Sequence, residues 1–165
     1  MQLNQSLISE LESESKSTRK ILERVPLEKA GWKPHEKSTP LGRLATHIAE
    51  LQGRIDLILN TDEHDFAKTG YSYKVAASSK ELLGIFEENC SKSLNALRSA
   101  TDESFNKNWT LRNGEKIFFS LPKLTAIRSS VFNHIYHHRA QLGVYLRLLE
   151  VPLPSIYGPT ADEPM

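Results

Sequence analysis

The 165-residue sequence has one cysteine, almost no net charge and no long apolar run. A single cysteine, Cys90, excludes an intramolecular disulfide and is typical of a reducing compartment. The 21 basic and 20 acidic side chains give a formal net charge of +1, and they form no basic block that would favour nucleic acid. No stretch reaches the ~18–20 apolar residues of a membrane span, and the first residues do not resemble a signal peptide. We therefore expect a cytoplasmic protein that binds neither nucleic acid nor membranes.

Length and composition predict a single domain over residues 1–165. Hydrophobic residues make up 39% and charged residues 25% of the chain, which is an ordinary globular mixture. Four segments repeat apolar residues at three- and four-residue steps, the spacing of amphipathic helices. They cover about residues 3–25, 40–58, 78–97 and 122–150. In the first segment, the polar residues Glu14 and Thr18 interrupt the apolar stripe.

Residues typical of helix ends separate these segments. Pro26 ends the first pattern, and Thr39-Pro40 resembles a cap followed by proline at the first helical position. Ser78 and Glu81 form a capping box that opens the third helix. Residues 60–77 lie between the second and third helices, and their number suits a functional loop or a long crossover.

A short β-hairpin is predicted before the last helix. The run from Trp109 to Phe119 has an Asn113-Gly114 pair in its middle, a strong local signal for a tight hairpin turn. An isolated two-stranded hairpin is only marginally stable, so we expect it to pack on the helices. The predicted fold class is therefore all-α, a four-helix bundle with one small hairpin.

The last predicted helix carries three histidines, His134, His137 and His138. Residues four apart lie on the same helical face one turn from each other, so His134 and His138 can bind one metal ion together. On a helical wheel that starts at Val131, these two residues fall on the apolar face or its edge. His137 points away from that face, which makes it the weaker candidate for a ligand.

A metal ion needs more than two ligands from one helix, and His47 is the best candidate for a third. It lies one turn after Leu44 and one turn before Leu51, at the flank of the apolar stripe of the second helix. His35 and His64 lie in polar stretches with no periodic partner. Three neutral imidazoles with one coordination position left open are typical of catalytic metal sites.

Structural roles for the same residues are the alternative interpretation. His134 and His138 could be core histidines that hydrogen-bond to their neighbours, and His47 could be a histidine at the edge of the core. Cys90 lies on the apolar face of the third helix, where a small buried hydrophobe is the commoner role than a ligand or nucleophile.

Three further residues flank the histidine pair. His137, Arg139 and Gln141 could hold the ligands in place through hydrogen bonds. Solvated positions on the helix surface are the commoner role for such residues. We therefore name them as candidates for support and not for coordination.

The run from Asn133 to Leu142 resembles the NHxxHHRxQL signature of the DinB family, which includes the YfiT-like metal-binding bundles. Trp32-Lys33-Pro34, His47 and the run from Ser155 to Glu163 add to the resemblance, which spans essentially the whole chain. Ala140 stands where the family commonly has glycine, a small-for-small change that leaves the candidate ligands untouched.

The resemblance implies an up-down-down-up four-helix bundle with a long crossover, often present as a homodimer. It also implies one divalent metal ion per chain, zinc or nickel, held by His47, His134 and His138. Characterised relatives use the metal to activate a low-molecular-weight thiol for S-transfer or isomerisation. The substrate would then be a small molecule.

Three hypotheses for the function remain open at this point. The first is a metal-dependent transferase, in which the ion deprotonates a small thiol that then attacks an electrophile. The second is a metal-dependent hydrolase. The third is a non-catalytic, metal-stabilised bundle that serves a stress response or an interaction. Substrate choice would depend on the connections 60–77 and 106–120, which contain no recognisable motif.

Overall fold

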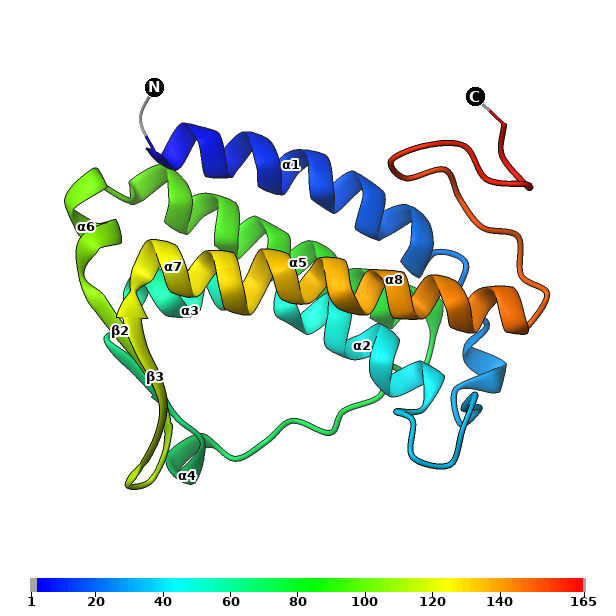
Figure 1. Ribbon diagram of the computed structural model, residues 1–165, viewed down its shortest axis with the longest axis horizontal. Helices are drawn as coiled ribbons and strands as arrows, with labels where there is room; N and C mark the ends of the chain where they lie inside the picture. The colour runs from blue at the N-terminus through cyan, green and yellow to red at the C-terminus, as the bar shows by residue number, and fades with distance from the viewer. Residues whose placement is uncertain (1–2, 165) are drawn as a thin grey trace.

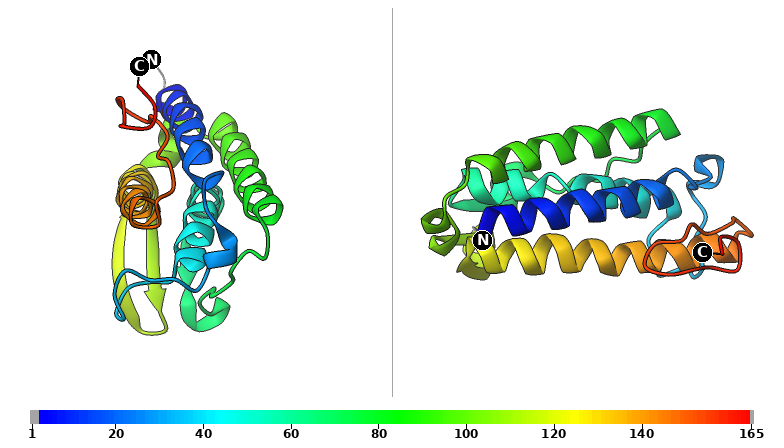
Figure 2. Two further views of the ribbon diagram at one scale, coloured as in Figure 1. Left: turned by 90° about the vertical axis from the view of Figure 1, so that its right-hand side faces the viewer. Right: turned by 90° about the horizontal axis from the view of Figure 1, so that it is seen from above.

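Four helical rods lie side by side along the long axis of the computed structural model, which describes residues 3–164 (Figure 1). The first rod is α1 (Leu3–Leu22), the second is α2 (Leu41–Leu51) with α3 (Arg54–Asn60), and the third is α5 (Ser79–Ser99). The fourth consists of α7 (Lys123–Ile127), the π-helical segment η2 (Arg128–Phe132) and α8 (Asn133–Leu148). Helices α1 and α8 run in one direction, whereas α2 and α5 run in the other (Figures 1 and 2).

A three-stranded mixed sheet extends from one end of these rods, so the predicted all-α class is wrong. Its strands are β1 (Glu63–Asp65), β2 (Asn108–Asn113) and β3 (Lys116–Pro122), in the order β1-β2-β3. The hairpin predicted on Asn113-Gly114 is present as the antiparallel pair β2–β3. Strand β1 adds to it in parallel, with His64 opposite Leu111. The indole of Trp109 donates to Thr61 Oγ1 at 3.0 Å, which joins the hairpin to the end of α3.

Strand β1 was missed because its three residues are polar and carry no apolar alternation. It is held instead by Asp65, whose side chain is only 6% exposed. The Asp65 carboxylate accepts hydrogen bonds from the backbone N–H groups of Ala67 and Gly114, both at 2.9 Å. These bonds connect β1 and the following short helix α4 (Phe66–Thr69) to the hairpin turn, where Gly114 has a positive φ of 59°. Residues 60–77 are therefore partly ordered into β1 and α4.

The helix start predicted at Ser78 is confirmed, because α5 begins at Ser79. Ser78 Oγ accepts from the Glu81 N–H at 3.1 Å, and Glu81 Oε2 accepts from the Ala77 N–H at 2.8 Å. Two further short helices, η1 (Leu27–Lys29) and α6 (Asp102–Asn106), lie in the connections between the rods. None of the described helices is both long enough and apolar enough to cross a bilayer.

The second predicted helix is divided into α2 and α3. Asn89 of α5 donates to the Ala49 carbonyl at 3.2 Å and so occupies an acceptor of the last turn of α2. Gly53 allows this approach, because a Cβ atom there would lie 2.4 Å from Asn89 Oδ1. Helix α3 therefore starts again at Arg54 with its direction preserved.

The fourth rod is interrupted by the π-helical segment η2, which a continuous helical wheel does not anticipate. The hydroxyls of Ser129 and Ser130 bond to the carbonyls of Thr125 at 2.8 Å and Ala126 at 2.6 Å, where they compete with the backbone ladder. The wheel that starts at Val131 therefore begins inside irregular helix. The four-residue spacing of His134 and His138 is unaffected, since both lie within regular α8.

Two buried apolar clusters fill the space between the rods, and α2 and α8 contribute to both. Ile48 of α2 and Leu142 of α8 belong to the first cluster, whereas Leu51 and Ile135 belong to the second. Along α8, His138 lies between Ile135 and Leu142, at the junction of the two clusters. The apolar core thus fixes the facing surfaces of α2 and α8 on both sides of the histidines.

Candidate metal centre

Three histidines meet between α2 and α8. His47 extends from α2, and His134 and His138 extend from successive turns of α8. The ring centroids lie 5.2 Å apart for His47 and His134, 4.9 Å for His47 and His138, and 4.6 Å for His134 and His138. One ring nitrogen from each residue lies within 4.8 Å of the other two. The three predicted histidines therefore form a group that could hold one metal ion.

The surroundings keep all three imidazoles neutral. Burial lowers the pKa of His47 from 6.5 to about 3, with smaller contributions from the positive charge of Arg54 and from the other two histidines. Burial and the charges of His138 and Arg54 lower the pKa of His134 to about 4. Burial also lowers the pKa of His138, although Gln141 opposes the shift. Each ring then offers a lone pair at neutral pH, which coordination requires.

A hydrogen bond on its outer side orients His138. His138 Nδ1 lies 2.7 Å from Gln141 Oε1, so Nδ1–H donates and Nε2 carries the lone pair. His134 lies near the backbone carbonyl of Ser130, which partly opposes the lowering of its pKa. Its Nε2 lies 3.5 Å from the Nε2 of His47. Two tetrahedral zinc ligands at about 2.0–2.1 Å from an ion are separated by roughly 3.4 Å, so this nitrogen spacing fits a shared metal.

A cavity of about 600 Å³ opens beside this centre and reaches it through His47. One wall is a polar stripe on α2 and α3, consisting of Arg43, His47, Glu50 and Arg54. The opposite wall comes from α4 and the chain that follows it, including Phe66 and the stacked ring of Tyr71. The stripe could have been found in the sequence, because its members are spaced by four, three and four residues, on one helical face. The apolar face of this helix predicts only His47 of the four.

The DinB family model matches residues 1–164 of this chain. The chain belongs to the DinB family. Among curated proteins, the uncharacterised protein YrdA of Bacillus subtilis is 23% identical over 158 residues, covering 92% of this chain and 86% of YrdA. Two solved DinB-like proteins share the fold of this member of the family. YjoA of Bacillus subtilis has a TM-score of 0.68 at 16% identity over 97% of this chain and 99% of its own. A protein of Bacillus cereus has a TM-score of 0.67 at 22% identity over 90% and 94%.

The supporting residues predicted for this DinB centre have different outcomes. Gln141 contacts His138 directly, as described above. The exposed ring of His137 packs on the ring of His138 at a centroid distance of 4.9 Å and is not a member of the three-histidine group. Arg139 is placed differently. Its guanidinium turns toward α1, where it bonds to Glu14 at 2.7 Å.

His35 and His64, which the sequence did not favour as ligands, lie outside the three-histidine group. Exposed His35 bonds within its own loop, where its Nδ1 accepts from the Lys37 N–H at 3.2 Å. His64 lies on β1 and lines the cavity, with its ring edge-on to Phe66 at 4.7 Å. Part of connection 60–77 thus borders the centre, whereas none of the described residues that line the cavity comes from 106–120.

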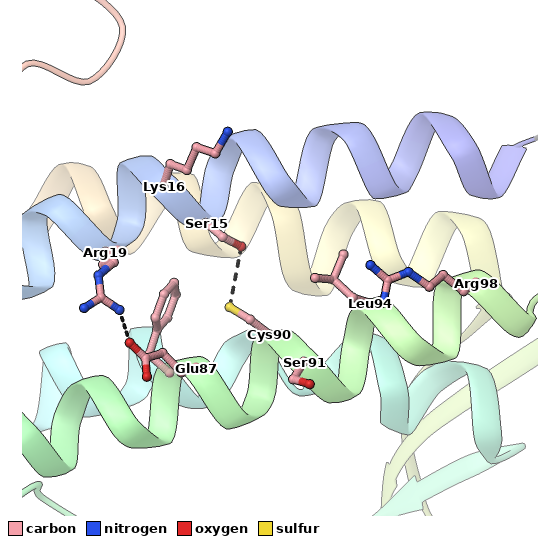
Figure 3. Close-up of a pocket in the computed structure, with 9 residues that line it drawn as sticks. Ser15, Lys16, Arg19, Glu87, Cys90, Ser91, Leu94 and Arg98 are labelled. Carbon is pink, nitrogen blue, oxygen red and sulfur yellow. Dashed lines mark hydrogen bonds and ion pairs between the residues drawn. The ribbon is translucent and has the colours of Figure 1, made fainter.

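The single cysteine of this DinB chain occupies a second, separate groove between α1 and α5 (Figure 3). Cys90 is buried, and its Sγ lies 3.5 Å from Ser15 Oγ. Burial raises the pKa of the thiol to about 11, so little thiolate is present at neutral pH. Its surroundings fit the predicted role of a small buried hydrophobe.

Proposed function

We propose that this DinB-family protein binds one divalent metal ion, zinc or nickel, through His47, His134 and His138, and that it is a metal-dependent enzyme acting on a small molecule. The observation that carries the proposal is the 600 Å³ cavity that reaches a group of three neutral histidines. Three imidazoles leave at least one coordination position free. A reactant that enters the cavity has access to that position.

The reaction that we favour is thiol transfer or isomerisation. A divalent ion held here would deprotonate a bound low-molecular-weight thiol and so supply a nucleophile without a protein base. The chain contributes the orientation of the ligands. Gln141 accepts from Nδ1 of His138 and so leaves Nε2 of that ring free to coordinate. Cys90 takes no part, because it lies in the separate groove between α1 and α5.

Two observations argue against a purely structural metal. A closed structural site usually has four protein ligands, and the only group of this kind within residues 3–164 has three. The two apolar clusters also fill the interior without help from the histidines. We therefore expect metal-free protein to remain folded, and added metal to raise its melting temperature only moderately through mass action.

The proposal is tested by titrating cobalt-substituted protein with 2-mercaptoethanol, with ethylene glycol as the matched control. Thiolate ligation should produce an intense sulfur-to-cobalt charge-transfer band with the thiol alone. Circular dichroism before and after chelation should show the same helical content. A cobalt spectrum indifferent to the thiol would refute thiol activation. Unfolding on chelation would refute an enzyme-type site and favour a structural metal.

A further inference from the structure

Arg54 is a cationic side chain in the cavity that has no acidic partner of its own. It is half-buried, and within residues 3–164 its guanidinium has neither an ion pair nor a hydrogen bond. Glu50 is the carboxylate whose charge raises the pKa of Arg54, but it is already occupied by other partners. Its Oε2 accepts from Arg43 at 2.6 Å, and its Oε1 accepts from the hydroxyl of Ser72 at 2.9 Å. A half-buried arginine without a partner is costly, because its five donors require acceptors.

The positive charge of Arg54 acts on all four histidines around the cavity. It lowers the pKa values of His47, His134, His138 and also His64 on the opposite wall. The ionised side chains that line the cavity are two arginines and one glutamate, which leaves one positive charge when the histidines are neutral. A divalent ion at the three histidines would add two more. The cavity therefore attracts anions.

We propose that the cavity binds the carboxylate of a small anionic substrate, with Arg54 as the residue that anchors it. The planar guanidinium fork matches a carboxylate and can donate two parallel hydrogen bonds to it. Without the ion, one unpaired arginine and one net positive charge suit a monoanion better than the dianion of a phosphate monoester. The stacked rings of Phe66 and Tyr71, 4.2 Å apart, offer an apolar surface for the rest of the molecule.

The spacing along the polar stripe limits the size of this substrate. Arg54 lies seven residues after His47, across the break between α2 and α3, so their backbones lie roughly 10 Å apart along the rod. The carboxylate and the reacting atom would therefore lie several bonds apart in one small molecule. The assignment of this anion as substrate rests on the proposed function. Binding of the carboxylate itself does not, because Arg54 is not a metal ligand.

The binding test uses metal-free protein and three probes that differ only in the polar group, followed by fluorine NMR. The probes are 4-(trifluoromethyl)benzoate, the corresponding benzamide and the corresponding phenylphosphonate. We expect wild-type protein to bind the benzoate about tenfold more tightly than the amide, which corresponds to one charge-assisted contact. Arg54→Gln should reduce this ratio to about one. Arg98→Gln, which removes the same charge from an exposed site on α5, should leave the ratio unchanged.

Two results with these probes would contradict the role of Arg54. Equal binding of benzoate and amide by wild-type protein, or an unchanged ratio in Arg54→Gln, would overturn the proposal. Tighter binding of the phosphonate would overturn the choice of a carboxylate. Should Arg54→Gln fail to fold, Arg54→Lys replaces it, because lysine keeps the charge without the guanidinium fork. The proposal then requires a lower ratio of benzoate to amide binding in Arg54→Lys than in wild-type protein. Metal content separates the two proposals. If the wild-type chain binds benzoate but no metal, only the proposed function is refuted. If it binds metal but does not prefer benzoate to the amide, only the carboxylate inference is refuted.

Discussion

Two polar clusters lie on neighbouring faces of α8, and the adjacent residues His138 and Arg139 belong to one each. His138 faces α2 with the other two histidines, whereas Arg139 faces α1. The Arg139 guanidinium, 3% exposed, donates to Glu14, to Thr18 Oγ1 at 3.2 Å and to the hydroxyl of Tyr157. The Tyr157 hydroxyl in turn donates to Glu14 at 2.7 Å. Each donor of this cluster thus has an acceptor within the cluster.

The histidine cluster differs because its inner nitrogens face one another. His47 Nε2 and His134 Nε2 lie 3.5 Å apart, and the pKa values of both residues favour the neutral ring. A single proton can join two of these nitrogens, but only a cation can join ring nitrogens of all three histidines at one point. The Arg139 cluster is therefore complete as it stands and stabilises the fold. The histidine cluster is arranged for a ligand that the chain does not supply.

The largest effect separating the two clusters concerns metal content. His138→Ala should leave less than about a tenth of the metal that wild-type protein carries, because two ligands do not hold the ion tightly. Mass spectrometry of protein purified without chelator measures the content directly. His35→Ala is the matched control and should keep about one ion per chain. Equal metal content in wild-type protein and His138→Ala would refute the assignment of the histidine cluster as the metal site.

The Arg139 cluster should show the reverse response. Glu14→Ala leaves a buried guanidinium without its carboxylate and should cost about 3 kcal/mol of the free energy of unfolding. Urea denaturation measures this loss, and the metal content of the variant should not change. Glu87→Ala removes one of the two carboxylate partners of Arg19, in an exposed ion pair between α1 and α5, so its loss of stability should be much smaller (Figure 3). Equal losses in the two variants would show that the buried cluster has no special role.

Acid should weaken the metal-free fold through the histidine cluster. The pKa values of His47 and His134 are about 3 and about 4 in the folded chain, against 6.5 when unfolded. Between these values the unfolded chain binds more protons, so the free energy of unfolding decreases as the pH falls from 6.5 toward 4. Above about pH 7 it should be constant. Urea denaturation of chelator-treated protein at pH 7.5, 6 and 5 checks the slope, and a flat profile would contradict the neutral state of the histidines.

The smallest effect is expected at His137. Its exposed ring packs on His138 without belonging to the three-histidine group, so His137→Ala should retain about one ion per chain. The same mass-spectrometric measurement applies. Loss of the ion in His137→Ala together with retention in His134→Ala would show that the wrong pair on α8 was chosen.

The features that sequence predicted correctly are those encoded by neighbouring residues. The Ser78 cap, the Asn113-Gly114 turn and the four-residue spacing of His134 and His138 each need only a short window of sequence. Tertiary contacts decided the rest. Strand β1 pairs with a strand more than forty residues later, through a buried aspartate instead of an apolar pattern. For this reason a chain that reads as all-α contains a mixed sheet.

The same division applies to the site. Glu14 and Thr18 were visible as an interruption of the first apolar stripe, but their partner Arg139 lies more than 120 residues away. Arg54 stands in regular register with His47, yet only the structure reveals that Arg43 and Ser72 occupy Glu50 and leave Arg54 unpaired. Sequence periodicity gives the face of a helix on which a side chain lies. It does not reveal which partner that side chain has.

The most direct test of the central claim is anomalous diffraction at the zinc edge from crystals of the zinc-loaded protein. We predict one peak per chain between α2 and α8, about 2.0–2.1 Å from a nitrogen of each of His47, His134 and His138. The remaining coordination position should face the cavity lined by Arg54. A peak held by His35, or a fourth ligand from the protein that closes the site, would contradict the account.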